Sequence, residues 1–302
     1  MARFGGFMAC MLALIAGLAL VPAVQIKSSS LPVPSNIELI LQPAPVALEK
    51  ESPRISDEVL VVEQFYRILK IGDGGVDPKY VKQKLYFHRD WMRIDDFADE
   101  QATLPAETFF IDFKARKIYD EDNLSREIHV VTFEERREKI AQNIKDVQRD
   151  LKNMDDGPQR KKFLRLSYAL LDQKRNYAQF VPPAKTPVAG VACQVTEIFA
   201  LDEPYKISCR IALHPDIELP CDYAEVLYLL KILGPGLREY LCRPPPLFHR
   251  LPMDLDLDLA VGGRLQFRVW KVERVRLNRL DPGLAKPPAF QTTPQTAPPK
   301  SR

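Results

Sequence analysis

An alternation of apolar and polar residues with a period of two most constrains the fold of this chain. It runs through residues 109–119, 205–214 and 254–269, and it is the pattern of strands with one buried face. Residues 59–71 and 80–97 are rich in β-branched and aromatic side chains, and a Gly-Asp-Gly-Gly turn signal lies between them. We therefore expect an α+β domain built on one large antiparallel sheet.

The period changes once, in the middle of the chain. Two apolar stripes with helical spacing follow one another, and Asp155-Asp156-Gly157-Pro158 separates them. Their members are Ile140, Ile144, Val147, Leu151 and Met154, then Phe163, Leu166, Leu170, Gln173 and Tyr177. The spacing predicts a helical hairpin inserted over 134–180, a short antiparallel coiled coil if the stripes face each other; alternatively, the stripes pack on the sheet. A further helix is expected from Tyr223, ended by Gly234-Pro235-Gly236.

Residues 1–23 have the pattern of a secretory signal peptide. Arg3 precedes an apolar run from Met8 to Val21, and Val21-Pro22-Ala23 suits a signal peptidase. The run is shorter than the about 20 residues that a spanning helix needs. We expect an exported protein, periplasmic or extracellular, with an anchor formed by an uncleaved N-terminal segment as the alternative.

Prolines and charges define the remaining organisation. Two proline-rich blocks predict a disordered linker at 24–56 and a disordered tail at 278–302, which leaves a single domain at 57–277. The net charge is only +3, and basic and acidic residues are interleaved. This composition argues against a nucleic-acid partner.

Four cysteines follow the signal: Cys193, Cys209, Cys221 and Cys242. An even number in an oxidising compartment favours disulfides. Local topology favours Cys193 with Cys209, on two adjacent strands, and Cys221 with Cys242, on either side of a helix. The alternative is that some are buried free thiols. Zinc is disfavoured because no ligand spacing is present.

No catalytic or metal motif fits this chain. Asp254-x-Asp256-x-Asp258 begins like a calcium loop, but the required glycine and glutamate positions hold Leu259 and Leu265. On a strand these aspartates would line the solvent face. Asp95 and Asp96 could serve acid–base chemistry, but adjacent strand residues point to opposite faces. We expect no cofactor, no metal and no enzymatic activity.

Several short motifs resemble an uncharacterised family of secreted bacterial proteins. They are Met92-Arg93-Ile94-Asp95, Ile111-Asp112 and the segment from Gly190 to Cys193. That family is distantly similar to the periplasmic lipoprotein carriers. The resemblance implies an unclosed barrel, a strongly curved antiparallel sheet with helices on its concave face and an apolar cavity between.

Two functional hypotheses follow. The first is a non-enzymatic exported protein that binds a hydrophobic, lipid or lipoprotein ligand in such a cavity, with Phe87, Phe109, Ile111 and Phe113 as candidate lining residues. The second is an envelope interaction protein that contacts a partner protein through its helical hairpin or its proline-rich tails.

Overall fold

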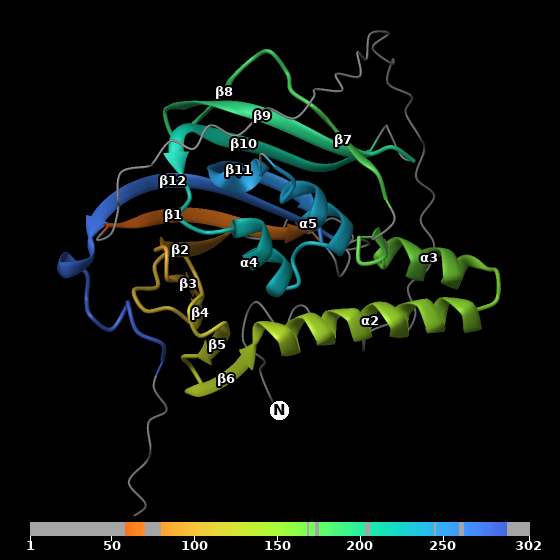
Figure 1. The fold of residues 1–302 in the computed structure, drawn as a ribbon, viewed down its shortest axis with the longest axis horizontal. Coiled ribbons are helices and arrows are strands. Elements are labelled where there is room, and N and C mark those ends of the chain that lie inside the picture. The colour runs from red at the N-terminus through yellow and green to blue at the C-terminus, as the bar shows by residue number, and fades with distance from the viewer. Residues whose placement is uncertain are drawn as a thin grey trace, which may run out of the picture.

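The computed structural model describes residues 58–69, 80–167, 169–172, 175–202, 206–244, 246–259 and 263–288. The expected signal peptide, the linker and the turn at 72–75 lie outside these residues. Within them, twelve strands form one antiparallel sheet in the order β6-β5-β4-β3-β2-β1-β12-β11-β10-β9-β7, and β8 pairs with β9. The sheet is not closed, so β6 and β7 are its two edges (Figure 1).

The first strand group is a meander that precedes the long helix. Its members are β1 (Glu58–Leu69), β2 (Val81–Phe87), β3 (Trp91–Asp96), β4 (Glu107–Asp112), β5 (Lys117–Asp122) and β6 (Glu127–Thr132). The β-branched and aromatic composition of residues 80–97 predicts one long strand, but the structure has two, β2 and β3. The chain turns at His88, where the His88 amide donates a 3.0 Å hydrogen bond to the Trp91 carbonyl.

The second strand group follows the helices. It comprises β7 (Tyr177–Phe180), β8 (Thr186–Val188), β9 (Val191–Ala200), β10 (Ile207–Glu218), β11 (Arg250–Asp258) and β12 (Arg264–Arg276). The last strand, β12, pairs with β1 along its whole length. This pairing joins the two strand groups into one sheet, so the sheet contains strands from both ends of the domain.

In the described part of the chain, four α-helices lie between the strands: α2 (Phe133–Asn153), α3 (Pro158–Leu166), α4 (Tyr223–Leu229) and α5 (Pro235–Leu241). Among the described residues, Leu247–His249 and Leu277–Arg279 form short 3-10 helices. No helix in the described part of the chain has both the length and the hydropathy to span a membrane.

The helical segment differs from the expectation in its second half. The stripe through Ile140 and Ile144 forms α2 and is buried there. However, α3 has only nine residues and ends at Leu166, and Tyr177 begins strand β7. The helix expected from Tyr223 is α4, but it ends at Leu229, five residues before Gly234, and Gly234-Pro235-Gly236 begins α5 instead. A proline at the first helical position suits this start, which the sequence pattern had not distinguished from a simple stop.

The main core lies between the sheet and the pair α4 and α5, on the face that we call concave (Figure 1). Tyr223 of α4 contacts the ring of Phe87 on β2, with ring centroids 5.4 Å apart, and also the ring of Phe248, 5.7 Å away. Both phenylalanines are at most 2% exposed. These contacts fix α4 on the middle of the sheet.

A smaller core covers the opposite, convex face. Its buried members are Val59, Val61, Tyr86, Trp91 and Phe110. Leu280, Leu284 and Ala285, which follow β12, pack against them. The first residues of the expected disordered tail, 278–288, are therefore part of the folded domain, because they supply the apolar cover that this face requires.

Candidate functional site

A row of buried polar residues crosses the concave face beneath α4. Gln64 on β1 is opposite Gln83 on β2, Gln83 is opposite Asp96 on β3, and Asp96 is opposite Glu107 on β4. None is more than 9% exposed. Buried polar side chains are uncommon unless they are hydrogen-bonded, so a row of four marks this part of the sheet as special.

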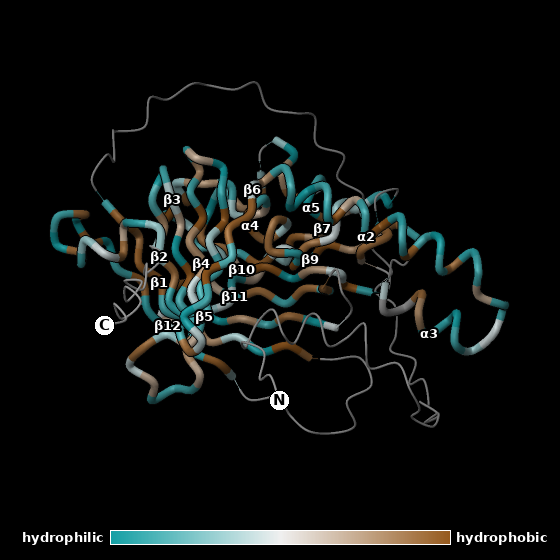
Figure 2. The backbone as a smooth tube through the Cα atoms, turned by 90° about the horizontal axis from the view of Figure 1, so that it is seen from below, coloured by the Kyte–Doolittle hydropathy of each residue, from teal (hydrophilic) through white to brown (hydrophobic). Residues whose placement is uncertain are grey.

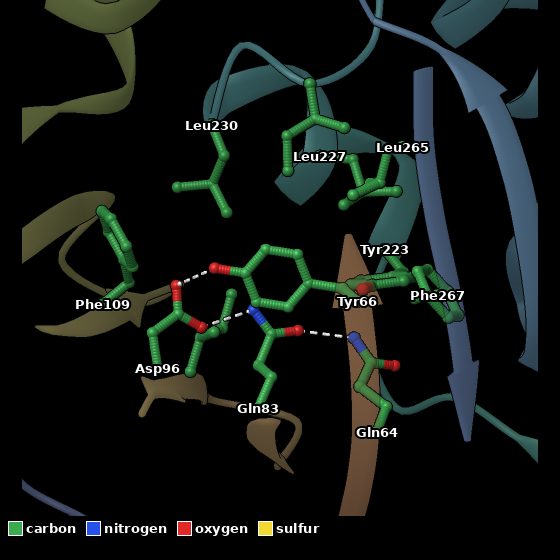
Figure 3. Close-up of a pocket in the computed structure, with 12 residues that line it drawn as sticks. Gln64, Tyr66, Gln83, Asp96, Phe109, Tyr223, Leu227, Leu230, Leu265 and Phe267 are labelled. Atoms are coloured by element: carbon green, nitrogen blue, oxygen red, sulfur yellow. Dashed lines mark hydrogen bonds between the residues drawn. The ribbon is translucent and has the colours of Figure 1, made fainter. Parts of the chain in front are cut away.

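Three of these residues form a continuous hydrogen-bond chain (Figure 3). Gln64 Nε2 donates to Gln83 Oε1 at 2.5 Å, and Gln83 Nε2 donates to Asp96 Oδ1 at 2.7 Å. The hydroxyl of Tyr66 donates to the other oxygen, Asp96 Oδ2, at 3.2 Å. Each carboxyl oxygen of Asp96 thus accepts a hydrogen bond from a side chain, in place of the water that burial removes.

Burial dominates the electrostatics of Asp96. Loss of water raises the pKa of this carboxyl to about 7, against the effect of the hydrogen bonds from Gln83 and Tyr66, which lower it. The neighbouring Asp95 contributes a further increase. Asp96 thus changes its charge near neutral pH, where an ordinary aspartate is fully ionised.

The row continues towards α2 through a third buried carboxyl, after Asp96 and Glu107. Asp120 on β5 is opposite Phe109, and burial raises its pKa, while Arg136 of α2, His129 and a side-chain hydrogen bond with Glu107 lower it. Asp120 and Arg136 are 8% and 9% exposed. The sheet row and the first turns of α2 thus share one buried charged region.

The prediction that Asp95 and Asp96 point to opposite faces is confirmed. Asp95 Oδ1 accepts hydrogen bonds from Arg93 Nε at 2.8 Å and from Thr108 Oγ1 at 2.9 Å. Arg93 and Thr108 alternate with the core residues Ile94 and Phe109, so they lie on the face opposite the row that contains Asp96. The two carboxyls therefore cannot serve as a joint acid–base pair.

The cavity next to the row is small. It has a volume of about 30 Å³ and lies between Asp96, Tyr66, Phe109 and the α4 residues Tyr223 and Leu227. This is the space that one water molecule occupies, whereas small-molecule pockets measure about 300 to 1,000 Å³. An acyl chain does not fit while α4 lies on the sheet.

The four candidate lining residues are all on or next to this core, but only Phe109 lines the cavity. Phe87 and Ile111 are fully packed, at 0% and 1% exposed, and Phe113 is half-buried against the core. The alternation placed them correctly on an apolar face. It could not show that α4 fills the space above that face.

A second, open hollow of about 250 Å³ lies between β7 and α5, lined by Arg175, Tyr177, Glu239, Tyr240 and Arg243. Its charges are already paired: Arg243 contacts Glu239 at 3.3 Å, and Arg175 contacts Asp202 at 2.9 Å. Within the described residues, no group of three potential metal-ligating side chains is arranged to hold an ion.

The predicted disulfides are wrong for this structure, in which Cys193, Cys209, Cys221 and Cys242 are all free. Cys209 is opposite Ile198 of β9, five residues from Cys193 and therefore about 17 Å away along the strand. A disulfide allows only about 4.4 to 6.8 Å between its Cα atoms. Both cysteines are buried as expected, but the strand register separates them. Cys242 Sγ instead lies 3.6 Å from Asp222 Oδ2.

Thiol labelling tests the cysteine states directly. Burial raises the pKa of Cys193 and Cys209, and it raises the pKa of Cys221 and Cys242 to about 12. We expect none of the four to react rapidly in the native protein near pH 8, and all four to react after unfolding without reductant. Peptide mapping that finds two of them unlabelled after unfolding would reveal a disulfide and contradict the structure.

The aspartates of the calcium-like motif lie on the solvent face of β11, as predicted, and each is paired across the sheet. Asp254 contacts Arg268 at 2.6 Å, Asp256 contacts Arg264, and Asp258 contacts Lys206 at 2.8 Å. The leucines between them are buried. These carboxylates stabilise strand pairing rather than gather around an ion.

Sequence reasoning did not identify most of the buried row. Gln64, Gln83, Glu107, Asp120 and Arg136 were not singled out, because each looks like a solvent-facing residue in its own segment. The available signal was polarity at strand positions on the same face as Phe109. Only the register of the strands shows that these positions are neighbours.

Comparisons with known proteins add little. No protein-family model matches this chain, and no curated protein matches it. Among solved structures, a chain of the complex structure of Pseudomonas aeruginosa MucA/MucB is 10% identical, with a TM-score of 0.31. The alignment covers 72% of this chain and 52% of that one, so this chain spans about half the length of its structural neighbour.

Proposed function

We propose that this is an exported, non-catalytic interaction protein that binds a partner protein through the arm formed by residues 145–166, the outer part of α2 together with α3. The observation that carries the proposal is the burial of α2. Its buried residues are Phe133, Arg136, Ile140 and Ile144, all in the first half of the helix. The outer half extends past the sheet and is mainly hydrophilic (Figures 1 and 2).

The base of the arm is held rigidly, which an interaction element requires. Thr132 and Glu135 form a reciprocal capping box at the start of α2. Arg137 Nη2 lies 2.6 Å from Glu225 Oε1 of α4, and Arg238 Nη2 of α5 lies 2.5 Å from the second oxygen of the same carboxylate. Three helices are thus tied together through one glutamate, so the arm is presented in a defined direction.

The surface of the arm mixes apolar and charged groups, as transient protein interfaces do. Leu164 is 46% exposed, and Phe163, Leu151 and Met154 are half-buried. A water-exposed helical extension gains little stability from the core. The arm therefore contributes little to the fold that carries it, which favours a role in binding.

A lipid ligand is not part of this proposal. The cavity beneath α4 holds about 30 Å³, roughly a tenth of the smallest usual ligand pocket. The predicted signal peptide, in contrast, supports an exported location, and the partner is then another exported or envelope protein.

Photo-crosslinking tests the arm. A photoreactive residue in place of Leu164 should give a discrete protein adduct in intact cells, because this side chain projects from the arm. The matched control is the same residue in place of Leu124, which is 80% exposed but lies between β5 and β6.

The second measurement replaces residues 147–163 with a short Gly/Ser linker. We expect the Leu164-dependent partner to be lost from the co-purified material while circular dichroism still shows the folded sheet. Equal adducts at positions 164 and 124, or a partner retained by the folded linker variant, would contradict the proposal.

A further inference from the structure

Arg136 is a buried cation with an unsatisfied donor. It lies on the inner side of α2, is 9% exposed, and its Nε has no hydrogen-bond partner among the described residues. The opposing charge that acts on it is Asp120, a carboxyl whose own pKa is raised by burial. A buried guanidinium with an unmade hydrogen bond is costly, so such a group points to a missing acceptor.

Lys231 faces the same region from the end of α4, in an unusual backbone conformation. The amide of Ile232 donates to the carbonyl of Leu227 at 2.8 Å, and the Lys231 amide donates to Tyr228 at 2.8 Å, which is a Schellman motif. Lys231, the residue after the C-cap Leu230, has a φ of 62°. Glycine normally occupies this position, because other residues are strained there.

A non-glycine residue in this conformation costs backbone free energy, so the Lys231 side chain is a candidate for a functional role. Lys139, an exposed residue three positions after Arg136 on α2, supplies a third positive charge near this junction. Burial lowers the pKa of Lys231, and the positive charges of Arg136 and Lys139 lower it further. Two further positive charges thus act on Lys231, while Asp120 is the opposing charge that acts on Arg136.

We propose that Arg136, Lys139 and Lys231 form a binding site for an oxyanion, the carboxylate or phosphate group of a ligand, at the junction of α2 and α4. An anion there would accept the free Nε–H of Arg136 and relieve the repulsion among the three cations. The site does not depend on the arm, because Arg136 and Lys139 lie on the base of α2 and Lys231 lies just after α4.

Titration of the full-length mature protein with inorganic phosphate and, separately, acetate tests the site, with sodium chloride at matched ionic strength. We expect one of the two anions to shift the side-chain Nε–Hε NMR signal of Arg136 saturably and to raise the melting temperature by about 2 to 4 °C. Phosphate identifies a phosphate ligand, and acetate a carboxylate. Saturable binding by neither anion overturns the proposal.

Lys231→Gly separates binding from folding. Glycine relieves the strained conformation, so this variant should melt at a higher temperature than the wild type yet lose most of the anion response. Lys145→Gln is the matched control, because Lys145 is exposed on the same helix beyond the site, and its anion response should equal that of the wild type. An unchanged response in Lys231→Gly would refute the site even if the variant is more stable.

Discussion

Gly234→Ala is expected to destabilise this protein by about 3 kcal/mol or more, and to lower its melting temperature by about 6 to 12 °C. A Cβ at position 234 would lie 1.8 Å from the carbonyl oxygen of Ala169. The neighbouring atom is backbone, so no side-chain rotation can relieve the overlap. Thermal unfolding followed by circular dichroism measures the effect.

The reason for this close approach is an interlock between the segment at 169–172 and the start of α5. Asp172 is fully buried, and its Oδ1 accepts from the amide of Gly236 at 2.7 Å, while its Oδ2 accepts from Leu237 at 2.8 Å. Tyr177 donates a third hydrogen bond to the same carboxylate at 2.7 Å. Any side chain at Gly234 would push α5 away from Asp172.

Gly283→Ala is the control, because the nearest atom to its Cβ would be a side-chain oxygen of Asp281 at 3.3 Å, which can move. We expect a change in melting temperature of at most a few degrees for this variant. Similar melting temperatures for Gly234→Ala and the wild type would show that Ala169 does not approach α5 as closely as the structure has it.

The interlock illustrates what the sequence can and cannot predict. Gly234-Pro235-Gly236 was interpreted as the end of a helix, but α4 ends earlier, at Leu229, and the three residues begin α5 instead. Their second role, to admit Ala169 and Asp172 to the start of α5, depends on residues more than sixty positions earlier in the chain. No local pattern carries that information.

Strand register could not be predicted from the sequence either, and it determines which residues meet at the candidate site. Alternation predicted which face of each strand is buried, and it placed Cys193, Cys209 and Phe109 inside correctly. Whether two buried residues on adjacent strands are neighbours depends on the register of those strands. The register separates Cys193 from Cys209, but it places Gln83, Asp96 and Glu107 next to one another. The sheet and its faces could therefore be predicted, whereas the buried row could not.

The second large effect is expected from Asp96, whose burial makes stability depend on pH. Its pKa is about 7 in the folded protein, against 3.8 for an ordinary aspartate. Between these values the folded state holds a proton that the unfolded state has released, so stability falls as the pH rises from about 4 to about 7. Over this window the loss from Asp96 amounts to roughly 4 kcal/mol.

Asp96→Asn should remove this contribution without disturbing the packing. The amide oxygen can accept from Gln83, and the amide nitrogen can donate to the Tyr66 hydroxyl, so both contacts of the carboxyl are kept. We expect the variant to match the wild type near pH 4 and to exceed its stability near pH 8. Urea unfolding across this range measures the difference between the two proteins.

The difference between the two curves isolates Asp96 from the other shifted carboxyls. Burial also raises the pKa of Asp120 and Asp172, but both are present in either protein and cancel. Asp155→Asn, at an exposed position, controls for the change of net charge. Parallel curves for the wild type and Asp96→Asn would mean that Asp96 is ionised in the folded protein, and that water reaches the polar row beneath α4.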